Sequence, residues 1–172
     1  ELDKVIADIN GTGYGLTLGI HSRNESHAEE LASRINVGNV YINRNQIGAM
    51  VGVQPFGGEG LSGTGPKAGG PLYMYRLLGA RPQAAVTSQL RQEQGATPQA
   101  EAAKPALQAL RGWASKQAPA MVALCDRYGE LALSGLTQLL AGPTGERNSY
   151  SLLPRERVLC LAADDKEAKT DL

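Results

Sequence analysis

Glycine and proline crowd residues 44–71, and this tract limits what the chain can fold into more than any other feature. Glycine favours turns and proline removes a backbone donor, so the tract predicts an ordered loop and no regular element. Within it, residues 58–63 (GEGLSG) match the G-x-G-x-x-G pattern of dinucleotide sites. Such a site needs a strand before the glycines and a helix after them. Pro55 precedes the motif and residues 64–71 (TGPKAGGP) follow it, so we expect no dinucleotide-binding fingerprint here.

Helices and strands alternate in the sequence before this tract. Residues 1–9 carry apolar side chains at the i, i+3, i+4 and i+7 positions of one helix face, and residues 10–13 (NGTG) end that helix. Alternating apolar residues predict strands over 15–21 and 39–43, with a helix between them. This order predicts an α/β fold in which the strands pair in parallel through a crossover, inside a wider sheet.

The N-terminus of the helix between those strands has several candidate caps. Ser22 and Asn24 both precede the apolar helix face, and their side-chain oxygens suit an N-cap. Ser26 and Glu29 also have the spacing of a capping box. The sequence alone leaves these alternatives open.

The composition changes sharply after residue 80. An apolar run over residues 72–78 (LYMYRLL) suits either a strand or a short helix. Residues 81–104 are instead rich in Gln, Ala, Pro and Glu, with almost no large apolar side chain. This composition predicts a linker.

The remainder of the chain predicts helices first and strands afterwards. Residues 105–141 predict a helical segment, in which Pro119 begins a second helix and leucines continue the apolar content as far as Leu140. Residues 142–172 predict a turn, a strand and, after a proline break, a buried strand over Val158–Ala162. We expect the chain to begin and end within a larger fold.

Charge and cysteine usage argue against several classes of protein. Seventeen basic and seventeen acidic residues leave no net charge, so we expect no nucleic-acid partner through this segment. No apolar run reaches the roughly 18 residues of a membrane span, so we expect no transmembrane segment. Cys125 and Cys160 both lie in apolar sequence, which predicts two buried, reduced thiols in a cytosolic protein.

No group of residues has the pattern of a complete catalytic or metal site. His21 and His27 are the only histidines, too few and too widely spaced for a metal centre, and we expect both to face solvent. Ser62 is followed two residues later by Thr64, where a nucleophile elbow needs glycine. From the residues alone we expect no catalytic residue, no metal ligand and no cofactor-binding residue in this chain.

Residues 14–78 nevertheless follow an ordered pattern. YGLTLGIHS, then a helix, VGNVYIN, a short loop and QPFGGEGLSGTG resemble the C-terminal stretch of the aldehyde dehydrogenase family. That family most often has Lys where this chain has Gly60, and Gly-Arg-Glu near positions 64–67. The form GGEGLSGTGPKAGGP resembles the L-glutamate γ-semialdehyde (pyrroline-5-carboxylate) dehydrogenase branch, in particular the dehydrogenase domain of bacterial proline utilization A proteins.

This resemblance implies a domain organisation that extends the α/β prediction. Residues 1–80 resemble the C-terminal part of an aldehyde dehydrogenase catalytic domain. Residues 81–104 would link this part to the helical segment at 105–141. Residues 142–172 resemble the beginning of a Rossmann-like, aldehyde-dehydrogenase-related C-terminal domain.

The resemblance also implies a reaction, in which an aldehyde is oxidised with NAD through a cysteine thioester. In proline catabolism the aldehyde is L-glutamate γ-semialdehyde and the product is L-glutamate. The nucleophile and the residues that bind NAD lie upstream in the resembled family, so this chain would supply a wall of the substrate pocket. FAD would belong to an upstream proline dehydrogenase domain.

Three residues are the implied substrate-binding residues. In the resembled family the loop after the Asn strand holds the substrate's α-carboxylate through backbone N–H groups, which here belong to Gly48 and Ala49. Phe56 would pack against the methylenes of the substrate. Without the resemblance, Gly48 is simply a turn residue and Phe56, the only phenylalanine, fills a core.

The implied partners are the upstream dehydrogenase and proline dehydrogenase domains of the same parent protein, and further copies of it in a homo-oligomer. The implied location is the cytoplasm, with the parent able to lie peripherally at the inner membrane. The alternative hypothesis is a non-catalytic structural or assembly module. Residues 81–172 favour this alternative because they show no chemistry.

Overall fold

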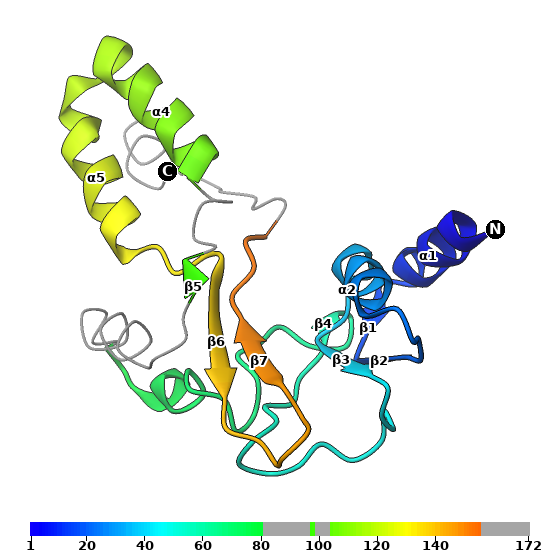
Figure 1. Cartoon of the computed structure of the whole chain (residues 1–172). Coiled ribbons are helices and arrows are strands. Elements are labelled where there is room, and N and C mark those ends of the chain that lie inside the picture. Colours follow the sequence, from blue (N-terminus) through cyan, green and yellow to red (C-terminus); the bar gives the residue numbers. More distant parts are fainter. Residues whose placement is uncertain (81–96, 99–103, 156–172) are drawn as a thin grey trace. The chain divides into compact units, whose positions relative to one another are not determined.

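A computed structural model describes residues 1–80, 97–98 and 104–155 of the 172 residues (Figure 1). The chain divides into two compact units, the first made of residues 1–94 with 138–150 and the second of residues 95–137 with 151–172. Residues 138–150 group with the N-terminal part of the chain in this division. The domain boundaries expected at residues 80, 104 and 141 stay predictions.

The centre of the first unit is a parallel pair of strands joined by a helix. β2 (Thr17–Ile20) pairs with β3 (Asn39–Ile42), with Thr17 opposite Asn39, and α2 (Glu25–Arg34) connects the two strands. The predicted parallel crossover is therefore confirmed. α1 (Leu2–Gly11) precedes this pair, as predicted, and buries Ile6.

Asn24 is the N-cap of α2. Its Oδ1 accepts a hydrogen bond from the N–H of His27 at 3.1 Å. Ser22 supports this cap from outside the helix, because its Oγ accepts from the N–H of Asn24 at 3.0 Å. The capping box expected from Ser26 and Glu29 is wrong, since Ser26 already lies inside the helix.

The predicted strand over 15–21 is two strands with different partners. β1 (Tyr14–Gly15) pairs antiparallel with β4 (Glu59–Gly60), while β2 pairs with β3. No helix follows β4 in residues 61–73, as the glycine and proline content of this tract predicts. The apolar run at 72–78 contains a short 3₁₀ helix, η1 (Met74–Leu77).

The second unit contains a helical hairpin. α4 (Lys104–Gln117) is followed by a 3₁₀ turn, η2 (Pro119–Met121), and by α5 (Val122–Leu131), which confirms the helix start predicted at Pro119. The two helices pack on each other and bury Ala114 and Cys125.

The helical segment expected over 105–141 is wrong in its last part. β6 (Leu136–Leu140) is a strand, hydrogen-bonded between β5 (Thr97–Pro98) and β7 (Asn148–Ser151). β5 also lies inside the segment predicted as a linker. The cause is visible in the alternating burial along β6, since a leucine run suits a half-buried strand as well as a helix face.

Some predictions fall outside the described part of the chain. The buried strand expected at Val158–Ala162, the state of Cys160 and most of the segment 81–104 are among them. β7 confirms the strand predicted before the proline break. Among the described residues no helix is long and apolar enough to cross a membrane.

Candidate functional site

The loop formed by residues 44–54, here called the 44–54 loop, leaves the sheet where β2 and β3 end. Asn43 stands at this exit with a left-handed φ of 57°. Its Oδ1 accepts from the N–H of Ser22 at 2.9 Å, and its Nδ2 donates to the carbonyl oxygen of Ser22 at 2.9 Å. Asn43 thus ties together the segments that follow the two strands. The loop therefore starts from a defined point at the carboxyl edge of the sheet.

Two side chains of the loop organise its own backbone. Asn45 Oδ1 accepts from the N–H of Ile47 at 3.0 Å. Gln54 Oε1 accepts from the N–H of Met50 at 2.8 Å, while the N–H of Gln54 donates to the carbonyl oxygen of Met50 at 2.9 Å. These bonds leave Gly48 and Ala49 between two ordered turns.

Gly48 and Ala49 each present a backbone N–H that forms no hydrogen bond with any described residue. Gly48 is exposed and has a φ of +83°, which strains any residue with a side chain. A Cβ placed on Gly48 would meet no atom within 4 Å. Two adjacent free donors beside open space are the elements of an anion site.

Phe56 lies beyond the other end of the loop and is half-buried. Its N–H and carbonyl oxygen pair with the backbone of Ala68, at 3.0 and 2.9 Å. Within the described part of the chain, no hydrogen bond joins Phe56 to Gly48 or Ala49.

A half-buried lysine holds the turn that carries Phe56. Lys67 Nζ donates to the carbonyl oxygen of Gly38, to Asn39 Oδ1 at 3.2 Å and to the carbonyl oxygen of Gly57 at 3.3 Å. Asn39, buried at the start of β3, also donates through Nδ2 to the carbonyl oxygen of Pro55 at 2.9 Å. Burial lowers the pKa of Lys67, and the nearby carboxylate of Glu59 opposes this.

The role of Lys67 was not predicted from the sequence. Its partners are backbone oxygens and one amide, and the nearest signal in the sequence was the departure from the family pattern at 64–67. Gly38 contributes through close approach, since a Cβ there would overlap the carbonyl oxygen of Gly57.

The sequence predicts no chemical role for Ser62, His21, His27 and Cys125. Ser62 Oγ accepts from the N–H of Gly15 at 3.0 Å, which joins the glycine tract to β1. His21 and His27 are exposed, as predicted, and no group of potential metal ligands forms among the described residues. Cys125 is a free thiol that is only 3% exposed, so the predicted buried state is confirmed for this cysteine.

Part of the chain matches a known protein family. The model of the aldehyde dehydrogenase family matches residues 1–80. Residues 1–80 belong to the aldehyde dehydrogenase family. The match ends where the composition of the chain changes.

Relatives extend the similarity beyond the aldehyde dehydrogenase segment. The bifunctional protein PutA of Escherichia coli is 54% identical over the whole chain, and that of Rhizobium meliloti is 45% identical over 96% of it. The 1-pyrroline-5-carboxylate dehydrogenase of Bacillus cytotoxicus is 46% identical over 47% of this chain and 16% of its own length. This chain spans only 13% of the length of the PutA relatives.

A solved structure is also similar to part of the chain. A point mutant of proline utilization A from Bradyrhizobium japonicum is 64% identical over 42% of this chain and 8% of its own, with a TM-score of 0.41.

Proposed function

We propose that residues 1–80 form the substrate-anchoring wall of an NAD-dependent dehydrogenase that oxidises L-glutamate γ-semialdehyde to L-glutamate in proline catabolism. Three observations support this proposal: the family of the segment, the names of its relatives and the geometry of the 44–54 loop. The geometry carries the assignment to particular residues. In this proposal the chain contributes binding and leaves bond-making to residues outside it.

The observation that carries the proposal is the pair of unpartnered N–H groups at Gly48 and Ala49. The substrate has an α-carboxylate at the end opposite its aldehyde, and backbone donors bind a carboxylate without carrying a compensating charge. Glycine at position 48 permits the φ of +83°. Alanine at position 49 adds only a methyl group. The substrate's carboxylate would therefore dock on the backbone of this loop.

Phe56 supplies the apolar part of the proposed site. Its backbone is fixed to Ala68 by two hydrogen bonds, and the residue is only half-buried in this segment. An aromatic side chain that is partly exposed here would cover the methylene groups between the carboxylate and the aldehyde. Phe56 and the 44–54 loop would then recognise different parts of one substrate.

NAD and the nucleophile are assigned to residues outside this chain. The glycine motif at 58–63 is followed by turns, so no helix N-terminus directly follows the motif to bind a pyrophosphate. When bound, NAD accepts the hydride from the substrate. FAD, the upstream dehydrogenase and proline dehydrogenase domains, a homo-oligomeric parent and a cytoplasmic location stay predictions from the resemblance.

The second unit favours a different role. Its described residues form a helical hairpin, β5 and one end each of β6 and β7, and its thiol at Cys125 is buried. We propose that this unit is a structural module of the parent protein. A structural module there is compatible with a substrate wall in residues 1–80.

The proposed function is tested by Gly48→Val in the complete parent enzyme. Valine cannot adopt the φ of Gly48 without strain, so both donors would move out of register. We expect kcat/KM for L-glutamate γ-semialdehyde to fall by ~10²-fold, which corresponds to losing about 2–3 kcal/mol of charge-assisted hydrogen bonding. Oxidation of propanal, which has no carboxylate, should change much less.

Gly52→Val is the matched control. Gly52 lies in the same loop, has a φ of +89° and also faces open space. It therefore carries the same strain at a distance from the two donors, and we expect a loss below about tenfold for either aldehyde. Equal losses for the two aldehydes in Gly48→Val would show that the loop is structural and that the carboxylate binds elsewhere.

A further inference from the structure

The turn that joins β6 to β7 reaches both ends of the 44–54 loop. Glu146 lies in this turn, where its N–H donates to the carbonyl oxygen of Pro143 at 3.1 Å. Its Oε1 accepts from Arg44 Nη1 at 3.0 Å, and its Oε2 accepts from Gln54 Nε2 at 3.2 Å. All of these residues belong to the first unit. One carboxylate thus closes the loop at its base.

The hydrogen bonds of Gln54 extend from this carboxylate into the loop. While Nε2 of Gln54 donates to Glu146, its Oε1 accepts from the N–H of Met50 at 2.8 Å. Met50 directly follows Ala49 in the chain. Among the described residues, Glu146 forms the only hydrogen bonds that join the 44–54 loop to another segment. Glu146 therefore adds the connection to a neighbouring segment that the loop's own hydrogen bonds do not supply.

The surroundings of Glu146 distinguish it from the charged residue beside it. The side chains of Arg44 and Glu146 are 27% and 30% exposed, whereas the neighbouring pair of Arg147 and Glu29 is 69% and 51% exposed. Arg44 also lies over the ring of Tyr41, 5.4 Å from its centre, which restricts the guanidinium further. A partly buried pair of this kind is screened less by solvent than an exposed one.

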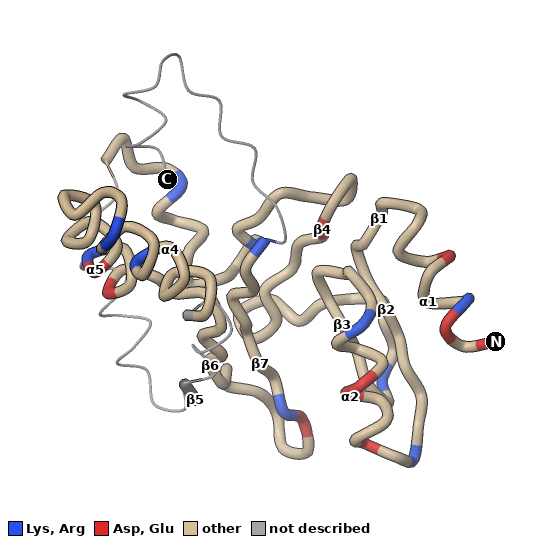
Figure 2. Tube along the Cα trace, turned by 90° about the horizontal axis from the view of Figure 1, so that it is seen from above, with Lys and Arg blue, Asp and Glu red and all other residues tan. Residues whose placement is uncertain are grey.

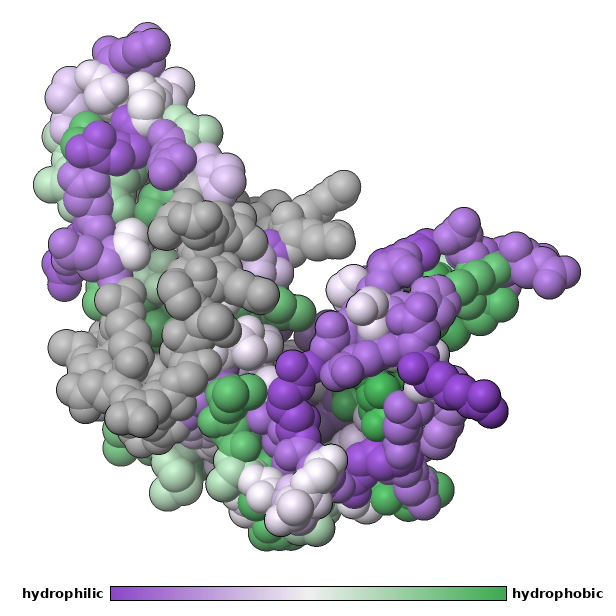
Figure 3. All heavy atoms as spheres, in the orientation of Figure 1, coloured by the Kyte–Doolittle hydropathy of each residue, from purple (hydrophilic) through white to green (hydrophobic). Residues whose placement is uncertain are grey.

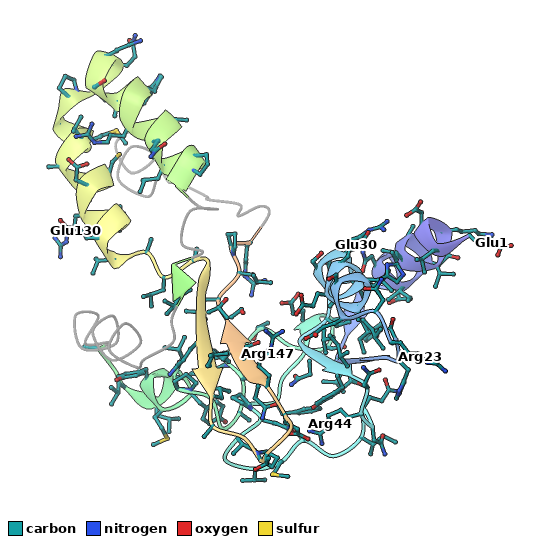
Figure 4. All side chains as sticks on the ribbon, viewed as in Figure 1. Glu1, Arg23, Glu30, Arg44, Glu130 and Arg147 are labelled. Carbon is teal, nitrogen blue, oxygen red and sulfur yellow. The ribbon has the colours of Figure 1, made fainter. Side chains whose placement is uncertain are left out.

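Arg147 has a separate task in the same turn. It forms an ion pair with Glu29 and lies 3.8 Å from Glu25, both on α2. Figure 2 shows the basic and acidic positions of this turn side by side, and Figure 4 labels Arg44 and Arg147. Arg147 therefore attaches the turn to α2, while Glu146 attaches it to the 44–54 loop.

We propose that Glu146 is a positioning residue that sets the specificity of the site for aldehydes that carry a distal carboxylate. This inference rests on the function proposed above. Glu146 holds Arg44 and Gln54 together, so the N–H groups of Gly48 and Ala49 are already ordered when the substrate arrives. Pre-ordering lowers the entropy lost on binding, and its effect is confined to substrates that use these donors.

The test is Glu146→Gln in the complete enzyme. Both partners of Glu146 are donors, so an amide keeps one acceptor and turns its own donors toward another donor. We expect KM for L-glutamate γ-semialdehyde to rise by about tenfold, with kcat and the kinetics on propanal within about twofold of the wild type. Glu146→Asp keeps the charge and both acceptors, and should hold the rise in KM below about threefold.

Arg147→Gln is the matched control, since it alters the next residue and removes only the exposed pair with α2. We expect its KM for both aldehydes to equal that of the wild type within about twofold. If Glu146→Gln does not fold, Gln54→Leu takes its place. Gln54→Leu removes the bond to Glu146 together with the bond that Gln54 Oε1 accepts from the N–H of Met50, and leaves the pair with Arg44. It interrupts the same connection from Glu146 into the loop, and should raise KM for the carboxylate-bearing aldehyde in the same way.

Two results would overturn the inference. One is an unchanged KM in whichever of Glu146→Gln and Gln54→Leu folds. The other is an equal loss for both aldehydes, which would assign Glu146 to folding alone. Failure of the proposed function looks different, because the wild-type enzyme itself would then not oxidise L-glutamate γ-semialdehyde. An effect of Gly48→Val without an effect of Glu146→Gln would leave the proposed function standing.

Discussion

Lys67 shows how a single cation can hold a glycine-rich backbone that has few side chains of its own. Its three hydrogen bonds go to the backbone carbonyl oxygens of Gly38 and Gly57 and to the side-chain oxygen of Asn39. Burial lowers its pKa because the charged amine loses water, but the three acceptors replace much of that hydration. The ammonium group therefore stabilises the backbone of the turn that contains Phe56.

Replacing Lys67 with methionine should loosen this turn. Methionine fills a similar volume but leaves the carbonyl oxygens of Gly38 and Gly57 without this donor, while Asn39 Oδ1 keeps the N–H of Gly57. We expect a cost of about 2 kcal/mol. We expect the amides of Phe56 and Ala68 to exchange with deuterium about 30-fold faster in the complete enzyme, as measured by native-state hydrogen exchange.

Lys4→Met is the control for Lys67→Met. Lys4 is exposed on α1, and lysine and methionine have similar helix propensities. This substitution should leave the exchange of Phe56 and Ala68 unchanged. Wild-type exchange rates in Lys67→Met would show that the backbone of the glycine tract is ordered without this cation.

At the residue scale, the sequence predicted positions better than contacts. It indicated Gly48 because glycine tolerates the backbone angle found there. It missed Lys67 and Glu146, because their partners lie 29 and 102 residues away in the sequence. Local pattern carries no information about such pairs. The placement of Gly48, Ala49 and Phe56 in a substrate site came from resemblance and stays a proposal.

At the scale of elements, the N-terminus of α2 distinguishes two capping arrangements that the sequence left open. One is a cap by Asn24, and the other is a capping box formed by Ser26 and Glu29. Asn24 bonds the N–H of His27, whereas Ser26 lies within the first turn of the helix. We expect Asn24→Ala to destabilise this turn by about 1 kcal/mol, and Ser26→Ala to be neutral or slightly stabilising. Hydrogen exchange of the His27 amide in the complete enzyme measures both effects. The opposite order of the two variants would restore the capping box.

The helices and strands predicted correctly were those in which apolar residues recur with a clear periodicity and in which characteristic residues mark the ends. α1, α2, β3 and α4 have such patterns, and glycine, asparagine or proline lies near their ends. β6 was mistaken for helix because the leucines at 136, 139 and 140 fit either period. Pairing with β5 and β7 decides its conformation, and such tertiary pairing is invisible in a short apolar run.

At the scale of the whole molecule, the first unit exposes more apolar surface than an isolated domain is expected to. Large apolar side chains are exposed on α1 and in the 44–54 loop, among them Leu2, Val5, Ile47 and Val51, the last at 97%. Figure 3 shows the apolar strip along α1. Such surface is typical of a segment that another part of a larger protein covers. It supports the proposal that the chain is one wall of a larger enzyme.

The last prediction concerns this chain expressed alone. We expect the 172-residue chain to form no NADH from NAD and any aldehyde, measured by NADH absorbance or fluorescence. No helix directly follows the glycine motif to bind the pyrophosphate, and the thiol of Cys125 is too deeply buried to reach a substrate. The complete parent protein, assayed under the same conditions, is the positive control. Turnover by the isolated chain that disappears in Cys125→Ser would contradict this prediction and would place the nucleophile within these residues.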